Sequence, residues 1–100
     1  IASFIGLAGA TTEEKVDSLI AELRSMNDQL DIPQGIKNYG KSGVKADTSI
    51  IDEKEFLEKL PEVAKNAIAD ACTGSNPRQP SQEEMEELLK ACYYDTEIDF

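Results

Sequence analysis

Helix-start signals recur three times along this chain and constrain its fold more than any other feature. In each, a Ser, Thr or Asp is followed three residues later by Glu, the capping-box pattern in which two side chains satisfy free NH groups of a first helical turn. The pairs are Thr11 with Glu14, Asp52 with Glu55, and Ser81 with Glu84. We therefore expect a helix to begin directly after each pair.

Apolar residues at helical spacing follow the first and last of these starts. The first set is Val16, Leu19, Ile20, Leu23, Met26 and Leu30, and the last is Met85, Leu88, Leu89 and Cys92. Both sets follow a period of 3.6 residues, so each predicts one apolar stripe on an amphipathic helix. Pro33 and Gly35 predict the end of the first helix. The opening residues 1–7 are interpreted as the end of an earlier helix.

The middle of the chain predicts two shorter helices separated at Pro61. A helix over 53–59 turns Phe56, Leu57 and Leu60 inward, and Pro61 suits the first position of a new helix. Val63, Ala64, Ala67, Ile68 and Ala71 form the stripe of that next helix. Sustained alternation is lacking, and the one candidate strand, 43–51, is short and polar. The predicted fold is all-α, an irregular bundle of four to five short helices.

Two polar segments and one turn separate these helices or follow them. Residues 41–51 are predicted to be an exposed loop, and 95–100 a tail that frays unless Ile98 and Phe100 dock. The cluster from Thr73 to Pro77 predicts a sharp turn, because Gly74 and Asn76 tolerate left-handed backbone and Pro77 restricts the residue before it.

Composition excludes several classes of partner. The formal charge of −10 argues against nucleic acid and anionic membranes, because both are bound through clustered Lys and Arg. No apolar run is long enough to span a bilayer, and no cleavable signal pattern opens the chain. We therefore expect a cytoplasmic protein. Cys72 and Cys92 are expected to be free thiols, since one late pair is not the framework of a disulfide-dependent domain.

The chain resembles the C-terminal end of the iron-dependent (group III) alcohol dehydrogenases, most closely the alcohol dehydrogenase half of bifunctional aldehyde-alcohol dehydrogenases. The matching runs, in order, are Thr11 to Val16, Leu30 to Pro33, Asp52 to Leu57, Cys72 to Arg78 (Cys-Thr-Gly-Ser-Asn-Pro-Arg) and Cys92-Tyr93-Tyr94. Residues 41–51 depart from the family pattern as a longer link. The resemblance implies that residues 1–100 are one segment, the C-terminal portion of the family's helical metal-binding domain.

The resemblance also implies an activity for a larger parent enzyme. That enzyme reduces a short, acetaldehyde-like aldehyde to its alcohol with NADH, and Fe²⁺ polarises the carbonyl oxygen. The family binds its metal through one Asp and three His, and this chain has no His. Metal ligands, the nucleotide site and the determinants of substrate length are therefore expected upstream. The fragment is expected to be scaffold, inactive alone, with no catalytic, cofactor-binding or metal-binding residue of its own.

Cys72 is the one candidate site residue. By resemblance it lines the substrate pocket, while the alternative is a small buried hydrophobic residue at a helix end. Implied partners are the rest of the parent enzyme, its small-molecule aldehyde or alcohol, and further copies in a homo-oligomer or filament.

Two other functional interpretations stay open, and a third is discounted. The whole chain is alternatively a non-enzymatic acidic helical module that binds a partner through an apolar groove. The turn after Cys72 either binds an anion or is a structural joint, with Arg78 capping carbonyls or pairing with a carboxylate. A calcium site in the tail lacks the required loop spacing. Tyr93 and Tyr94 are best explained by packing of the last helix.

Overall fold

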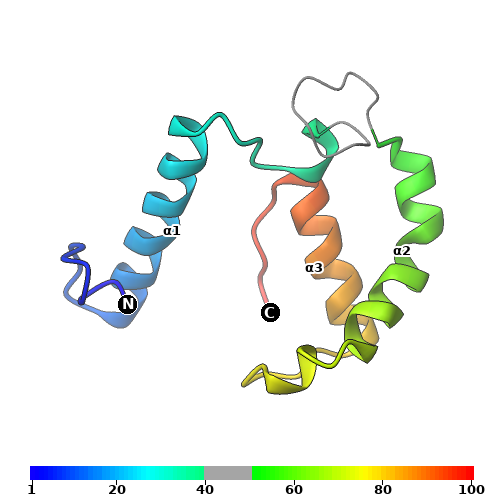
Figure 1. Ribbon diagram of the computed structural model, residues 1–100. Helices are drawn as coiled ribbons and strands as arrows, with labels where there is room; N and C mark the ends of the chain where they lie inside the picture. The colour runs from blue at the N-terminus through cyan, green and yellow to red at the C-terminus, as the bar shows by residue number, and fades with distance from the viewer. Residues whose placement is uncertain (40–50) are drawn as a thin grey trace. The chain divides into compact units, whose positions relative to one another are not determined.

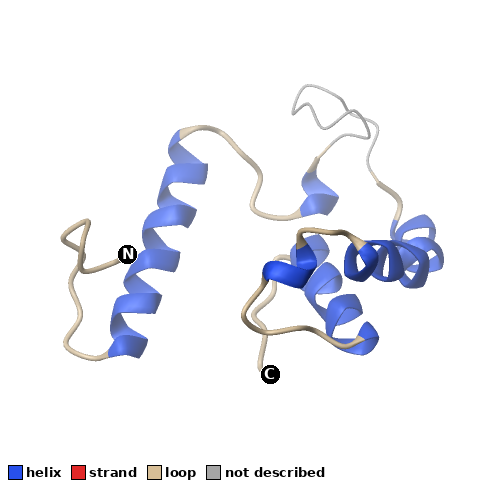
Figure 2. Cartoon of the chain, turned by 60° about the horizontal axis from the view of Figure 1, so that its bottom comes forward, coloured by secondary structure: helices blue, strands red, loops and turns tan. Residues whose placement is uncertain are grey.

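The computed structural model describes residues 1–39 and 51–100 and contains three α-helices and two 3-10 turns (Figure 1). In chain order these are α1 (Thr12–Gln29), η1 (Ile36–Asn38), α2 (Glu53–Ala69), η2 (Thr73–Ser75) and α3 (Gln82–Tyr94). No strand occurs within those two ranges (Figure 2). The all-α prediction is confirmed, but the expected four to five short helices are replaced by three longer ones. The predicted loop at 41–51 and the candidate strand at 43–51 lie, except for Ile51, outside the described residues.

The chain divides into two compact units, Ile1–Gln34 and Gly35–Phe100. The first contains α1 and begins with hydrogen-bonded turns over residues 1–7, where we expected the end of a helix. Gly9 has a φ of 146°, and a Cβ there would lie 2.8 Å from the Lys15 nitrogen. Only glycine therefore fits at this approach to α1.

The predicted capping box starts α1. The Thr11 hydroxyl accepts from the Glu14 NH at 3.2 Å, and the Glu14 carboxylate accepts from the NH groups of Ala10 and Thr11 at 2.6 and 3.3 Å. The Ala10 bond, followed by the Thr11 bond, lowers the pKa of Glu14. The helix ends before Pro33, as predicted. Asp31 there has a φ of 61°, and the Ile32 NH donates to the Asn27 carbonyl at 2.8 Å.

The apolar stripe of α1 has the predicted helical spacing but little cover. None of the α1 residues is buried; Leu19 is half-buried, and the other stripe residues range from 46% exposed at Met26 to 63% exposed at Leu30. Val16, Ile20 and Leu23 lie between these values. A stripe that is half exposed gives only part of its hydrophobic stabilisation, so this face is suited to further burial.

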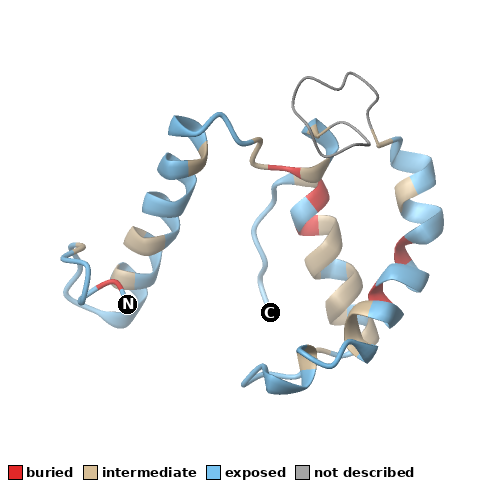
Figure 3. Ribbon diagram, viewed as in Figure 1, coloured by how far each residue is buried: buried red, intermediate tan, exposed pale blue. Residues whose placement is uncertain are grey.

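Helix α2 runs unbroken through Pro61, which corrects the prediction of two helices meeting at that residue. Leu60 is 4% exposed and Ala64 is fully buried, and Figure 3 shows buried stretches of α2 between exposed ones. A continuous helix keeps both residues on the side that packs. Pro61 lacks the NH that would donate to the Leu57 carbonyl, and its ring crowds that carbonyl. Leu57 is 41% exposed. Burial of Leu60 and Ala64 along one continuous helix therefore outweighs the cost of a proline in its interior.

Helices α2 and α3 pack against each other in the second unit. The Phe56 and Tyr93 rings stack with centroids 4.2 Å apart, and Tyr94 meets Tyr93 edge-on at 4.9 Å. The Tyr93 hydroxyl donates to the Ile51 carbonyl at 2.8 Å, and the Tyr94 hydroxyl donates to Glu53 at 2.5 Å. The interpretation that Tyr93 and Tyr94 are packing residues is confirmed.

Turn η1 lies against α3 and supports its C-terminal end. Gly35, just before η1, is buried, and a Cβ there would lie 3.1 Å from the Tyr93 carbonyl oxygen. The close approach of the two backbones explains the glycine.

Candidate functional site

The candidate site is the connection from α2 to α3, residues 70–81, which begins beside Cys72. Its first contact with α2 is the Thr73 hydroxyl, which donates to the Ala67 carbonyl at 2.6 Å. Ala67 lies in the last turn of α2, where carbonyls lack helical partners. The predicted sharp turn is therefore fastened directly to the end of the helix before it.

Cys72 is held by both of its backbone polar groups. Its NH donates to the Asp70 carboxylate at 2.8 Å. Its carbonyl accepts from the Ser75 NH at 3.1 Å and from the Ser75 hydroxyl at 2.7 Å. The residue itself is exposed and its thiol is free. Within the described chain Cys72 is therefore an exposed side chain on a fixed backbone, and not a small buried one.

Gln79 closes the same turn from its far end. Its side-chain nitrogen donates to the carbonyls of Thr73 at 3.1 Å, Gly74 at 3.3 Å and Asn76 at 2.6 Å. No sequence signal pointed to Gln79, because an isolated glutamine in a loop has no pattern that identifies its partners.

The turn is unsuited to binding an anion through its backbone. The NH groups of Cys72 and Thr73 donate to Asp70, that of Ser75 donates to Cys72, and that of Asn76 donates to Thr73. A backbone anion site needs several NH groups directed at the ligand. With these four already committed, the structure favours the structural joint over the anion site.

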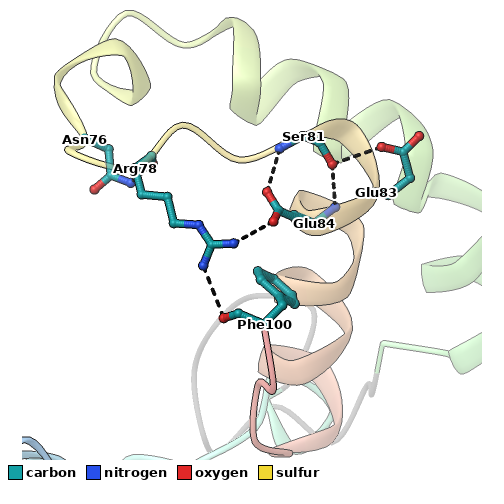
Figure 4. Close-up of polar contacts among 6 residues, drawn as sticks. All are labelled: Asn76, Arg78, Ser81, Glu83, Glu84 and Phe100. Carbon is teal, nitrogen blue, oxygen red and sulfur yellow. Dashed lines mark hydrogen bonds and ion pairs between the residues drawn. The ribbon is translucent and has the colours of Figure 1, made fainter.

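Arg78 joins the turn to α3 and to the tail (Figure 4). Its guanidinium pairs with the Glu84 carboxylate at 2.6 Å, donates to the Phe100 carbonyl at 3.1 Å and lies 5.2 Å from the centre of the Phe100 ring. The predicted carboxylate pairing of Arg78 is confirmed, and the carbonyl that it binds belongs to Phe100 in the tail and not to the end of a helix.

Glu84 serves this ion pair and the start of α3 at the same time. Its carboxylate accepts from the Ser81 NH at 3.0 Å, and the Ser81 hydroxyl accepts from the Glu84 NH at 3.2 Å, which completes the predicted capping box. The pKa of Glu83 is lowered, mainly by its own backbone NH and then by the Ser81 hydroxyl. The first turn of α3 and the end of the connection therefore form one polar cluster (Figure 4).

The tail over 95–100 is partly docked. Thr96 donates its NH to the Ala91 carbonyl at 3.1 Å, and Arg78 holds Phe100. Ile98 and Phe100 are 38% and 44% exposed and line a hollow of about 80 Å³ beside α3. We predicted that the tail frays unless these two side chains dock, and in the structure they are partly docked.

A larger, mostly apolar hollow of about 250 Å³ lies along α2. Its lining residues are Ile51, Glu55, Phe56, Lys59, Leu60 and Val63. Cys72 does not line it, so this structure does not place the candidate residue beside that hollow.

Comparison with known proteins decides the family. The family model described as "Fe-containing alcohol dehydrogenase family, C-terminal" matches residues 1–93. This chain belongs to the iron-containing alcohol dehydrogenase family. The match includes the whole connection described above and most of α3.

Curated relatives in this family are much longer than the chain. The chain is 45% identical over its full length to an NADPH-dependent butanol dehydrogenase of Clostridium saccharobutylicum, covering 23% of that protein. Its identity is 37% over 93 residues to an aldehyde-alcohol dehydrogenase of Clostridium acetobutylicum and 32% over 96 residues to a bifunctional aldehyde-alcohol dehydrogenase of Escherichia coli. It covers 10% of each of those two proteins.

The residues of this chain do not fit the iron site that the family name implies. The sequence contains no His. Across 1–39 and 51–100, no group of three or more Cys, Asp or Glu residues is placed to hold a metal ion.

No helix in these two ranges has the length and apolar character needed to cross a membrane.

Proposed function

We propose that this chain is the C-terminal helical part of an alcohol dehydrogenase that reduces a short, acetaldehyde-like aldehyde to its alcohol. Cys72 lines one wall of the substrate pocket, and the other residues are scaffold. The observation that carries this proposal is the 45% identity to a butanol dehydrogenase along the full length of the chain. Two features of the structure support it.

The first feature is the incomplete burial of α1. Apart from the half-buried Leu19, its stripe is about half exposed from Val16 to Leu30, which suits a helix that packs on a larger body. The chain corresponds to 23% and 10% of the length of the relatives above, so residues outside it supply that body.

The second feature is the way in which Cys72 is presented. Its backbone is fixed from both sides and its thiol is exposed. A side chain that lines a substrate pocket must have a fixed position, because misplacement weakens substrate binding. The two relatives named as aldehyde-alcohol dehydrogenases also act, by name, on a carbonyl and its alcohol.

Iron and NAD(H) are proposed for the enzyme as a whole, and no step involving either is assigned to residues of this chain. The nucleotide proposed from the family resemblance is NADH, whereas the butanol dehydrogenase is named for NADPH. We place the enzyme in the cytoplasm, with the rest of the parent chain as first partner and further copies in a homo-oligomer or filament as the next.

The test uses the full protein as its gene encodes it, with both thiols present. Aldehyde reduction is measured with NADH and with NADPH, and alkylation of Cys72 and Cys92 by iodoacetamide is followed separately by peptide mass spectrometry. We expect activity with NADH, and Cys72 alkylation slowed several-fold by alcohol with nucleotide. Cys92, also exposed, is the internal control and should react at an unchanged rate.

Two results would contradict the proposal. A protein that reduces no aldehyde with either nucleotide is not an alcohol dehydrogenase. Equal protection of both thiols would remove Cys72 from the pocket, because only general shielding affects two distant cysteines alike. The acidic interaction module, the competing interpretation, predicts no activity and no protection of either thiol.

A further inference from the structure

The structure assigns Gln79 a positioning role: its side-chain amide holds the turn that presents Cys72. The inference rests on the proposed function, in which Cys72 lines the substrate pocket, and adds a residue that acts on that pocket from behind. Gln79 itself faces the turn and not the exposed thiol, so it is a positioning residue and not a catalytic one.

The amide of Gln79 bonds to three carbonyls of one short turn. Its nitrogen lies 2.6 Å from the Asn76 oxygen, 3.1 Å from that of Thr73 and 3.3 Å from that of Gly74. Two amide hydrogens are thus shared among three acceptors. Without this donor, three neighbouring carbonyls would lose a common partner and the turn would lose its closure.

The closed turn is connected to Cys72 by a short path of bonds. The Thr73 carbonyl that accepts from Gln79 also accepts from the Asn76 NH at 3.0 Å. Ser75, inside the turn, donates two hydrogen bonds to the Cys72 carbonyl. Loosening the turn therefore releases the carbonyl side of Cys72, while the Asp70 bond to its NH remains.

The position of Gln79 in the sequence explains how its side chain is directed. It precedes Pro80 and follows Pro77 by two residues, so the local backbone has few conformations. Arg78 beside it reaches instead to Glu84 and Phe100 (Figure 4). Two consecutive side chains therefore bind different parts of the structure. Gln79 binds the turn, and Arg78 binds the start of α3.

The test is Gln79→Glu in the full protein, since Glu has the same shape but no amide donor. We expect hydrogen exchange of the amides that bond inside the turn, those of Ser75 and Asn76, to accelerate about tenfold as the turn opens locally. The KM for the alcohol should rise about three- to tenfold, while kcat changes less than about twofold, the pattern of lost substrate binding.

Gln29→Glu is the matched control. It makes the same chemical change at an exposed glutamine that donates to the Ser25 hydroxyl, at the end of α1 in the other compact unit. Neither the exchange rates of the turn nor the KM should change. A rise in KM in both variants would assign the effect to added charge and overturn the inference.

Each outcome separates this inference from the proposed function. Unchanged exchange in Gln79→Glu overturns the inference, and so does faster exchange with an unchanged KM. If the Gln79→Glu variant does not fold, Ser75→Ala is used in its place, because it removes only the hydroxyl bond to the Cys72 carbonyl. An unchanged KM in Ser75→Ala also overturns the inference. A wild-type protein without aldehyde reduction instead refutes the proposed function.

Discussion

Tyr94 and Glu53 link α3 to the start of α2 through a hydrogen bond of 2.5 Å between residues 41 positions apart. This bond, and secondarily burial, raises the pKa of Tyr94 from 10.0 to about 12. The donor must be protonated, so its contribution to stability is complete below pH 10. The contribution is lost as the pH rises from 10 to about 12, because the unfolded chain releases that proton first.

We predict that Tyr94→Phe lowers stability at neutral pH and that its deficit relative to wild type shrinks through that window. Urea unfolding at several pH values measures the deficit, and tyrosinate absorbance should lose the step near pH 12. Tyr39→Phe is the control and should keep that step. A deficit that stays constant up to pH 12 would mean that the hydroxyl bond does not stabilise the fold.

Single residues differ in how far local sequence reveals their contacts. Thr11 and Ser81 were predictable as caps because each bonds to an NH three residues away, a distance that the capping-box pattern covers. Gln79 was not predictable. Its three acceptors are carbonyls of a turn whose shape depends on how α2 and α3 are joined, and sequence spacing does not encode that shape.

At the scale of elements, α2 contains Pro61 nine residues into a helix of 17 residues. We predict that Pro61→Ala stabilises the chain by about 1 to 3 kcal/mol, because alanine restores the donor to Leu57 and proline is the least favourable residue inside a helix. Urea unfolding followed by circular dichroism measures the change. A loss of stability would show that the proline ring makes contacts worth more than the missing bond.

Lys65→Ala, at an exposed position of the same helix, is the matched control. It also introduces alanine into α2, and stability should change by less than about 0.5 kcal/mol. An equal gain in both variants would point to helix propensity in general and not to Pro61.

The boundary predicted at Pro61 was wrong for a reason that applies beyond this helix. Proline's preference for a first helical turn is a local tendency, whereas Leu60 and Ala64 on either side of it are buried together. Packing of both residues on one face requires an unbroken helix. The boundaries set by caps at Thr11, Asp52 and Ser81 held because no packing demand opposed them.

At the scale of the whole molecule, the proposal that the chain is part of a larger body predicts that the exposed stripe of α1 is covered in the full protein. We predict that the pair Ile20→Gln and Leu23→Gln changes the stability of the 100-residue chain by less than about 0.5 kcal/mol, since both side chains are already half exposed. In the full protein the same pair should cost about 2 to 4 kcal/mol through lost burial. Thermal and urea unfolding of both forms give the comparison.

The polar-face variant Glu22→Gln should be neutral in both forms and serves as the control. A full protein as tolerant of the apolar pair as the short chain would show that the stripe stays uncovered there. Helix α1 would then not pack on residues outside the chain, although family membership would stand.

Helix starts, the end of α1 and the turn after α2 were determined by the sequence alone, because each depends on bonds between residues a few positions apart. Only the tertiary structure decided three further features: the continuity of α2, the hydrogen bonds from Gln79 to the Cys72 turn, and the hydrogen bond between Tyr94 and Glu53. Those features depend on which side chains become buried together or are brought close by the joining of two helices. Periodicity predicts that a stripe exists, as on α1, but only packing decides whether it is covered.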